Sequence, residues 1–290
     1  MTTLSIIIVS YNTWQYLRSC LRRIFAASYP WELEVIVIDN ASTDGSAELV
    51  RGEFPAVKLI QSPRNGGFAH ANNLGFAAAR GDYLLMLNSD TEVQGDALAQ
   101  VVEFLKTHDH VGIASARLVY PDFTDQGVAR TFPTPVNALF GRRSLLTRLF
   151  PNNRYARRYL LSRQHCTDEP FEVDWVSGAC LMFPRRLLEQ IGGLDERFWM
   201  YWEDADFCFR AKQSGWRVFC LPKAVVVHHE GKSSGGRRHW KTIVEFNRSA
   251  YRYYRKHYLR SRLQPMTAVA ATFLTLRTAT LLFANALRTR

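Results

Sequence analysis

The chain has 290 residues, 47% of them hydrophobic, so it can bury a sizeable core in one large or two small domains. This composition excludes a disordered chain. Its five cysteines form no Cys-x-x-Cys pair, which excludes a zinc knuckle and a disulfide framework and indicates a reducing compartment. The N-terminus has no basic region and too short an apolar run for a signal peptide, so we expect a cytoplasmic protein.

The net charge of +11 is spread unevenly along the chain. Pro135 to His165 holds seven arginines and no acid, and Trp240 to Arg290 holds ten lysines or arginines against Glu245. A basic surface of this kind predicts an anionic partner, either membrane headgroups or a nucleic acid.

Strands and helices alternate along the first 120 residues. The predicted strands are continuous apolar runs, as in strands buried on both faces: Leu4–Ser10, Glu34–Ile38, Val57–Gln61, Tyr83–Leu87 and Val111–Val119. Predicted helices lie between them, at Trp14–Ala27, after Asp44, at Gly67–Arg80 and at Asp96–Thr107. The alternation predicts a parallel sheet with right-handed crossovers.

Polar residues follow several of these strands, at the sheet edge where open α/β sheets bind their ligands. They are Ser10, Asn12, Asp39, Asn65, Gly66, Asn88, Ser89 and Asp90. The glycine-rich turns of dinucleotide and P-loop sites are absent from the sequence, so the set predicts a nucleotide crevice of another kind. For Asn88 to Asp90 alone, a turn in which Asp90 caps the next helix is the alternative.

After Pro121 the regular pattern stops until a predicted strand at Trp175–Phe183 and a short helix at Arg185–Ile191. We expect a long functional excursion from Asp122 to Glu172, with short helices around Ala138–Phe150 and Tyr155–Leu161.

The segment LDERFWMYWEDADFCFR, from Leu194 to Arg210, places five acids among six aromatic residues. Glu203, Asp204 and Asp206 are predicted to begin a helix, where the macrodipole favours acids for purely structural reasons. Carboxylates in an apolar wall also have raised pKa values and can act as bases near neutral pH. Both interpretations stay open at this point.

Two further strands are predicted at Trp216–Leu221 and Val225–Glu230. The second contains His228 and His229, which are either structural or ligands that complete an oxygen-rich metal site elsewhere in the fold.

Seven motifs taken together make the chain resemble the inverting glycosyltransferases of family 2, which have the GT-A fold, and most closely their rhamnosyltransferase-like branch. That branch builds bacterial O-antigen and cell-wall polysaccharide. The motifs are IIIVSYN, VIVIDNASTDGS, NGGFAHANNLG, LLMLNSD, GACLMFPR, GGLDERFWMYWEDADFCFR and HHEGKS. The resemblance implies an α/β fold with a mostly parallel central sheet flanked by helices and a C-terminal helical extension.

The resemblance also implies roles for individual residues. The base and ribose of a dTDP- or UDP-sugar donor would be held by Ser10, Asn12 and Asp39, with Asn65 and Gly66 nearby. Asn88, Ser89 and Asp90 would stand in the family's Asp-x-Asp position, with Asn88 bringing one less negative charge than the family's first Asp. Asp90 and His228, or His229 in its place, would bind Mg or Mn. Asp204 would be the general base, and Glu203 would help to bind a lipid-linked glycan acceptor.

The same resemblance divides the chain into a glycosyltransferase domain at 1–235 and a basic, partly apolar helical extension at 236–290. Within the first, 1–120 would bind the nucleotide sugar and 121–235 the acceptor. The sequence has no Gln-x-x-Arg-Trp motif, which favours single additions, and L-rhamnose is the donor sugar that the branch suggests.

The extension ends in an apolar run, Gln264 to Asn285, that Arg277 interrupts near its middle. A central charge costs about 2.5 to 3.5 kcal/mol in a spanning helix, so we expect attachment to the inner face of the cell membrane instead. Packing on the enzyme core or in a homodimer is the alternative. Two other functions stay open, a sugar-nucleotide nucleotidyltransferase and a basic module that binds nucleic acid, although we expect no nucleic-acid partner.

Overall fold

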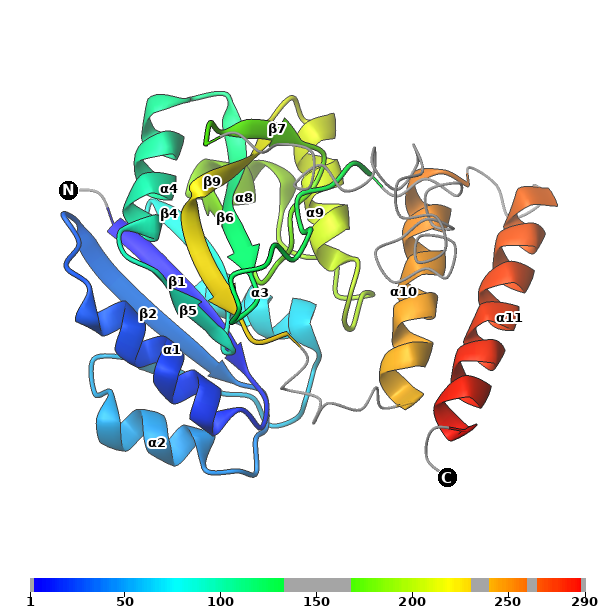
Figure 1. Cartoon of the computed structure of the whole chain (residues 1–290), viewed down its shortest axis with the longest axis horizontal. Coiled ribbons are helices and arrows are strands. Elements are labelled where there is room, and N and C mark those ends of the chain that lie inside the picture. Colours follow the sequence, from blue (N-terminus) through cyan, green and yellow to red (C-terminus); the bar gives the residue numbers. More distant parts are fainter. Residues whose placement is uncertain (1–2, 133–167, 231–239, 260–264, 288–290) are drawn as a thin grey trace.

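The computed structural model describes residues 3–132, 168–230, 240–259 and 265–287, and at its centre is one nine-stranded sheet with helices on both faces (Figure 1). The strand order is β3-β2-β1-β4-β8-β6-β9-β5, with β7 also paired to β9. The predicted helices at 138–150 and 155–161 lie outside the described residues.

The first half of the sheet follows the predicted alternation. Its elements are β1 (Thr3–Ser10), α1 (Trp14–Ala26), β2 (Glu32–Asp39), α2 (Ser46–Glu53), β3 (Lys58–Gln61), α3 (Phe68–Ala78) and β4 (Tyr83–Asn88). All pairings among β1, β2, β3 and β4 are parallel. Ser10 lies opposite Asp39 in this register, and Val9 lies opposite Asn88.

The second half of the sheet is mixed. Its elements are β5 (Thr91–Val93), α4 (Ala97–Thr107), β6 (Val111–Val119), β7 (Phe171–Val173), β8 (Cys180–Pro184), α8 (Arg185–Ile191), α9 (Glu203–Gln213) and β9 (Arg217–His228). Strand β8 runs antiparallel to both β4 and β6, and β9 runs parallel to β6. Four of the eight pairings in the described chain are antiparallel, so the mostly parallel character holds only for the first half.

The strands differ from the sequence prediction in three ways. The strand expected at Trp175–Phe183 begins at Cys180, because Trp175 instead forms an isolated bridge to Arg130 and Gly178 lies in the turn before β8. The two strands expected at 216–221 and 225–230 are one strand, β9, which continues through a register irregularity opposite Ala116 and Arg117. The short strands β5 and β7 were not predicted, since three residues carry no periodicity.

Each face of the sheet is covered by its own hydrophobic cluster, because alternate residues of a strand point to opposite faces. Ile6 and Ile8 of β1 join the cluster under α1, α2 and α4, whereas Ile7 joins the cluster under α3, α8 and α9. Helix α3 approaches β1 closely at Gly75, where an added Cβ would overlap the Ile7 side chain.

Two C-terminal helices lie beside the second cluster, α10 (Trp240–His257) and α11 (Pro265–Leu287) (Figure 1). Helix α10 contributes Ala250, Tyr253 and Tyr254 to that cluster, and α11 contributes Leu274. Among the helices of the described chain, none combines the length and the apolar composition needed to cross a membrane.

We predict that Gly75→Ala lowers the free energy of unfolding by about 1–2 kcal/mol, because overpacking against Ile7 outweighs the gain in helix propensity. Urea denaturation measures the change. Gly52→Ala in α2 is the matched control, since nothing lies within 4 Å of its added Cβ, and it should leave stability unchanged or raise it by up to about 1 kcal/mol. Equal effects at both positions would contradict the close approach.

Candidate active site

The strand directions bring the predicted site residues to one edge of the sheet. Strands β1, β2, β4 and β9 all end there, because β8 is antiparallel to β4 and to β6, and β6 is parallel to β9. Their last residues are Ser10, Asp39, Asn88 and His228. The residues just before β8 lie at the same edge, where Asn88 donates its backbone N–H to Ala179 O at 3.0 Å.

Buried hydroxyls and one carboxylate line the β1 and β2 part of this edge. Ser10 Oγ lies 3.0 Å from Thr13 Oγ1, which lies 2.9 Å from Ser89 Oγ. Asp39 is 2% exposed and accepts one hydrogen bond, from the Ser42 backbone N–H to its Oδ2. Its buried Oδ1 has no hydrogen-bond partner among the described residues, so that oxygen is available to a ligand donor.

An amide network holds the loop before α3 next to the end of β2. Asn40 Nδ2 donates to Asn65 Oδ1 at 3.0 Å, and Asn40 Oδ1 accepts the Gly66 backbone N–H at 3.0 Å. On the other side of β2, Asn12 has a φ of 54° and its Oδ1 accepts the Thr43 backbone N–H at 2.8 Å. The predicted residues Asn12, Asn65 and Gly66 therefore surround the end of β2.

Asp90 and His228 meet at the end of β4 and β9, with Asp90 Oδ1 3.3 Å from His228 Nε2. Gln126 fixes the histidine ring: its Nε2 donates to His228 O at 2.7 Å, so its Oε1 accepts from His228 Nδ1 at 2.9 Å. In the neutral ring the proton is thus on Nδ1, His228 Nε2 faces Asp90, and Asn88 Nδ2 lies 3.3 Å from it. His229 points elsewhere, to Glu92 Oε1 at 3.2 Å.

This pair fits a divalent cation. Adjacent ligands of an octahedral ion lie about 3 Å apart, close to the distance between Asp90 Oδ1 and His228 Nε2. A carboxylate and an imidazole held by a second hydrogen bond are a donor set that manganese accepts more readily than magnesium, which prefers oxygen ligands alone. In the described chain no three His, Cys, Asp or Glu side chains gather around one point, so most of the coordination would come from a ligand and water.

The acidic pair at the start of α9 reaches the same edge through Gly178. Asp204 Oδ2 accepts the Gly178 backbone N–H at 3.0 Å, and its Oδ1 accepts the Ala205 N–H at 2.8 Å. Burial raises the pKa of Asp204, and the N–H donors and Arg130 offset that rise only in part. Burial and the charge of Asp204 raise the pKa of Glu203 well above its usual value.

Glu203 is 5% exposed, and its Oε2 has no hydrogen-bond partner among the described residues. The backbone turn before it is unusual, because Tyr201 and Trp202 are consecutive non-glycine residues with φ of 68° and 73°. Such conformations cost about 1–3 kcal/mol each and persist only where the surroundings impose them. The turn sets the direction in which α9 presents Glu203 and Asp204.

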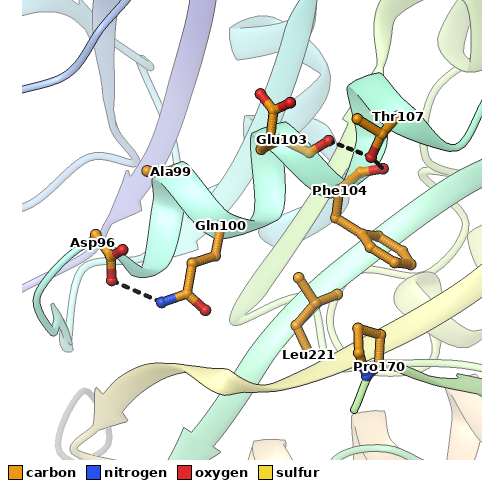
Figure 2. A pocket seen from close by; sticks show the side chains of 8 residues that line it. All are labelled: Asp96, Ala99, Gln100, Glu103, Phe104, Thr107, Pro170 and Leu221. Atoms are coloured by element: carbon orange, nitrogen blue, oxygen red, sulfur yellow. Dashed lines mark hydrogen bonds between the residues drawn. The ribbon is translucent and has the colours of Figure 1, made fainter. Parts of the chain in front are cut away.

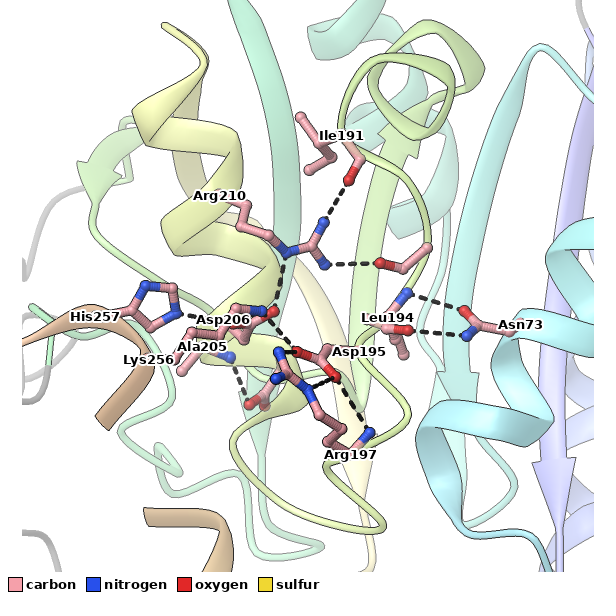
Figure 3. Close-up of polar contacts among 12 residues, drawn as sticks. Asn73, Ile191, Leu194, Asp195, Arg197, Ala205, Asp206, Arg210, Lys256 and His257 are labelled. Carbon is pink, nitrogen blue, oxygen red and sulfur yellow. Dashed lines mark hydrogen bonds and ion pairs between the residues drawn. The ribbon is translucent and has the colours of Figure 1, made fainter. Parts of the chain in front are cut away.

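The third acid of this turn, Asp206, has a structural role (Figure 3). It is fully buried, and its carboxylate oxygens lie 2.9 Å from Arg210 Nε, 2.6 Å from Lys256 Nζ and 2.8 Å from His257 Nε2. Burial alone would raise its pKa, but the hydrogen bonds from His257 and Lys256 and the charge of Arg210 lower it. Arg210 also donates to the carbonyls of Ile191 and Gly193, so the cluster joins α8, α9 and α10.

The acidic segment also contacts α3, on the β1 and β2 side of the site. Phe68 donates its backbone N–H to Trp199 O at 2.7 Å. The Asn73 amide bonds both backbone groups of Leu194, each at 2.9 Å, as Figure 3 shows. These bonds fix the acids of α9 relative to the strand ends.

A separate hollow of about 500 Å³ lies between α4 and β9 (Figure 2). Its lining consists of Asp96, Ala99, Gln100, Glu103, Phe104, Thr107, Pro170 and Leu221. It contains none of the predicted site residues, so we place the candidate active site at the strand ends.

With this geometry in place, comparison with known proteins defines the class. The fold is that of GT-A glycosyltransferases. The mannosyltransferase PcManGT from Pyrobaculum calidifontis, solved with GDP-Man and Mn2+, superposes with a TM-score of 0.61 at 22% identity over 98% of this chain and 72% of that chain. S. aureus TarS 1-349 with UDP-GlcNAc gives 0.59 at 19% identity, over 94% and 70%.

The family model Glycosyl transferase family 2 matches residues 5–192, and the chain belongs to this family. Over 243 residues it is 28% identical to the N-acetylglucosaminyl-diphospho-decaprenol L-rhamnosyltransferase of Mycobacterium tuberculosis, covering 80% of this chain and 78% of that protein. The predicted family and fold are thereby confirmed, and the match favours glycosyl transfer over nucleotidyl transfer.

Sequence reasoning missed several residues that support this edge. Asn40 follows Asp39 in the strand-end motif, so its position was a usable signal. Gln126 and Gly178 act on His228 and Asp204 through tertiary contacts that no local pattern marks.

We predict that Asp206→Ala lowers the free energy of unfolding by about 3 kcal/mol at neutral pH, because Arg210, Lys256 and His257 lose a buried carboxylate partner. The pKa of Asp206 is lowered in the folded state, so this stabilisation is complete above about pH 5 and is lost as the pH falls below 3.8. Urea denaturation at several pH values measures the difference. The exposed Asp109, paired with Arg186, is the control, and Asp109→Ala should cost under about 1 kcal/mol.

Proposed function

We propose that the protein transfers a glycosyl group, with inversion, from a nucleoside diphosphate sugar to a hydroxyl of a lipid-linked glycan. The observation that carries this proposal is the Asp204 carboxylate, held by the Gly178 N–H at the strand-end edge that also carries Asp39, Asp90 and His228. A base and an anion-binding edge are what single-displacement glycosyl transfer needs.

Each part of the edge has a task in this reaction. Asp39, with its free Oδ1, binds the nucleoside, supported by Ser10, Asn12 and the Asn65–Gly66 loop. Ser89 and Asn88 line the path from there to Asp90. A manganese or magnesium ion held by Asp90 and His228 would neutralise the charge that develops on the leaving diphosphate.

Asp204 performs the proton transfer. The acceptor hydroxyl oxygen attacks the anomeric carbon, the bond from that carbon to the diphosphate oxygen breaks, and Asp204 takes the hydroxyl proton. The nucleoside diphosphate leaves with the bonding electrons, so the anomeric centre is inverted without a covalent intermediate. Burial raises the pKa of Asp204 toward neutrality and makes it a stronger base than an exposed carboxylate. Glu203, beside it, contacts the acceptor.

The name of the mycobacterial relative supports L-rhamnose as the donor sugar and a lipid-linked acceptor. The solved structures with GDP-Man and UDP-GlcNAc support a nucleotide sugar donor, for which dTDP- and UDP-sugars are our candidates. The product would belong to a bacterial surface polysaccharide such as O-antigen.

An apolar stripe on α11 supports attachment to the inner face of the membrane. Its members are 42% to 68% exposed and recur at helical spacing: Val269, Phe273, Leu276 and Phe283. Arg277 lies off this stripe, because its guanidinium bonds Asn247 and covers the Phe246 ring of α10 at 5.4 Å. The neighbouring helix α10 carries exposed cations that favour anionic lipid, Lys241, Arg248 and Arg255.

We predict that purified enzyme releases nucleoside diphosphate from dTDP-rhamnose in the presence of Mn2+ and a GlcNAc-diphospholipid, in a panel that includes UDP- and GDP-sugars. Asp204→Asn should lower kcat at least about a thousandfold, because it removes the base. Asp90→Asn should lower it comparably and raise the Mn2+ concentration required. Undiminished turnover in Asp204→Asn would overturn the base assignment, and full activity in excess chelator would overturn the metal assignment.

We predict that the protein floats with phosphatidylglycerol vesicles and much less with phosphatidylcholine vesicles. Burying a phenylalanine contributes about 1.5–3 kcal/mol, so Phe273→Ala with Phe283→Ala should weaken binding at least about tenfold. Phe25→Ala is the control, because Phe25 lies on α1 and is as exposed as Phe273. Unchanged flotation of the double variant would contradict the membrane role of the stripe. If the wild-type protein is a dimer and the double variant is a monomer, the stripe belongs to a homodimer interface instead.

A further inference from the structure

The turn before the acidic pair needs support from outside itself. Tyr201 and Trp202 both adopt the left-handed conformation, and Glu203 and Asp204 follow directly on α9. Non-glycine residues leave this conformation unless neighbouring groups hold them in it. The source of that support is therefore a candidate for control of the acceptor site.

Helix α10 supplies the support. Ser249 Oγ donates to Met200 O at 3.0 Å, which fixes the backbone before the turn. The Phe246 ring packs edge-on against Tyr201 at 5.5 Å and against Trp202 at 5.7 Å between ring centres. Phe246 thus contacts both members of the turn, and Trp202 also contacts Tyr253 at 5.3 Å and Tyr254 at 5.7 Å between ring centres.

Two features separate Phe246 from an ordinary packing residue. It is half-buried and belongs to neither hydrophobic cluster, so filling the core does not explain its position. The Arg277 guanidinium of α11 lies 5.4 Å from its ring centre, and Arg277 also bonds the adjacent Asn247. The ring is thus held by α11 while it contacts the turn.

We propose that Phe246 is a positioning residue for glycosyl transfer: its ring fixes the Tyr201–Trp202 turn and thereby the direction in which Glu203 and Asp204 face the acceptor. The C-terminal helices then form part of the acceptor side of the site, in addition to any membrane contact. This inference rests on the proposed function, since it assigns a role within the same transfer.

The test compares Phe246→Ala, Phe246→Tyr and Tyr258→Ala in the transfer assay on the full chain. Tyr258 is the matched control, because it lies in the aromatic cluster of α10 and contacts Phe209, Tyr253 and Tyr254. Phe246→Ala should lower kcat about tenfold to a hundredfold and change the KM for the donor less than about twofold. Phe246→Tyr should restore kcat, since it keeps the ring.

The pH profile of kcat is the second readout. Transfer requires deprotonated Asp204, so kcat rises with pH through the raised pKa of that group. The charged groups that act on Asp204 are Glu203 and Arg130, and Asp206 acts in turn on Glu203. Loss of the ring admits water to the turn and should move this acid limb to lower pH in Phe246→Ala only.

A kcat for Phe246→Ala that matches Tyr258→Ala, with the same pH profile as wild type, would overturn the positioning role. A wild-type enzyme without transfer activity would instead refute the proposed function itself. Thermal unfolding of each variant separates loss of fold from loss of rate, and a folded Phe246→Ala with normal nucleotide binding and reduced kcat is the expected result.

Discussion

The antiparallel strand β8, placed between β4 and β6, is the constraint on which the candidate site depends. It reverses direction inside a sheet that is otherwise parallel across β1, β2 and β4. The residues that precede β8 therefore lie beside the ends of β1, β2 and β4. Gly178 is among them, and its N–H donates to the Asp204 carboxylate, which it holds at the edge where Asp90 and His228 meet. A fully parallel sheet would place that N–H at the opposite edge.

Three acids in one helical turn show how surroundings divide the roles of identical groups. The macrodipole favours all of them, so the helix alone does not distinguish them. Asp206 is bonded by Arg210, Lys256 and His257 and has a lowered pKa, which makes it a fixed anion that joins α9 to α10. Burial raises the pKa values of Glu203 and Asp204, and the charge of Arg130 offsets this rise only in part at Asp204. The stable anion holds the helix, and the pair with raised pKa values remains available for chemistry.

Sequence reasoning predicted the first half of the fold well, because buried parallel strands are continuous apolar runs and their ends carry polar residues. Asp39 and Asp90 were placed at one edge by that argument alone. The second half was less accessible, since strands β5 and β7 are too short for periodicity and the pairing of β8 depends on tertiary contacts. The roles of Gln126 and Gly178 could not be predicted either, because each acts on a residue more than twenty positions away.

Arg277 illustrates the same limit in the C-terminal extension. In the sequence it interrupts an apolar run, and its charge counts against a spanning helix. In the structure it leaves the exposed stripe of α11 uncharged, because its guanidinium turns toward Asn247 and the Phe246 ring. The position of Arg277 therefore has two consequences. The exposed stripe of α11 stays apolar, and the Phe246 ring of α10 is held against the turn that precedes Glu203. A helix pair built in this way connects the surface proposed to meet lipid with the acids proposed to meet a lipid-linked acceptor.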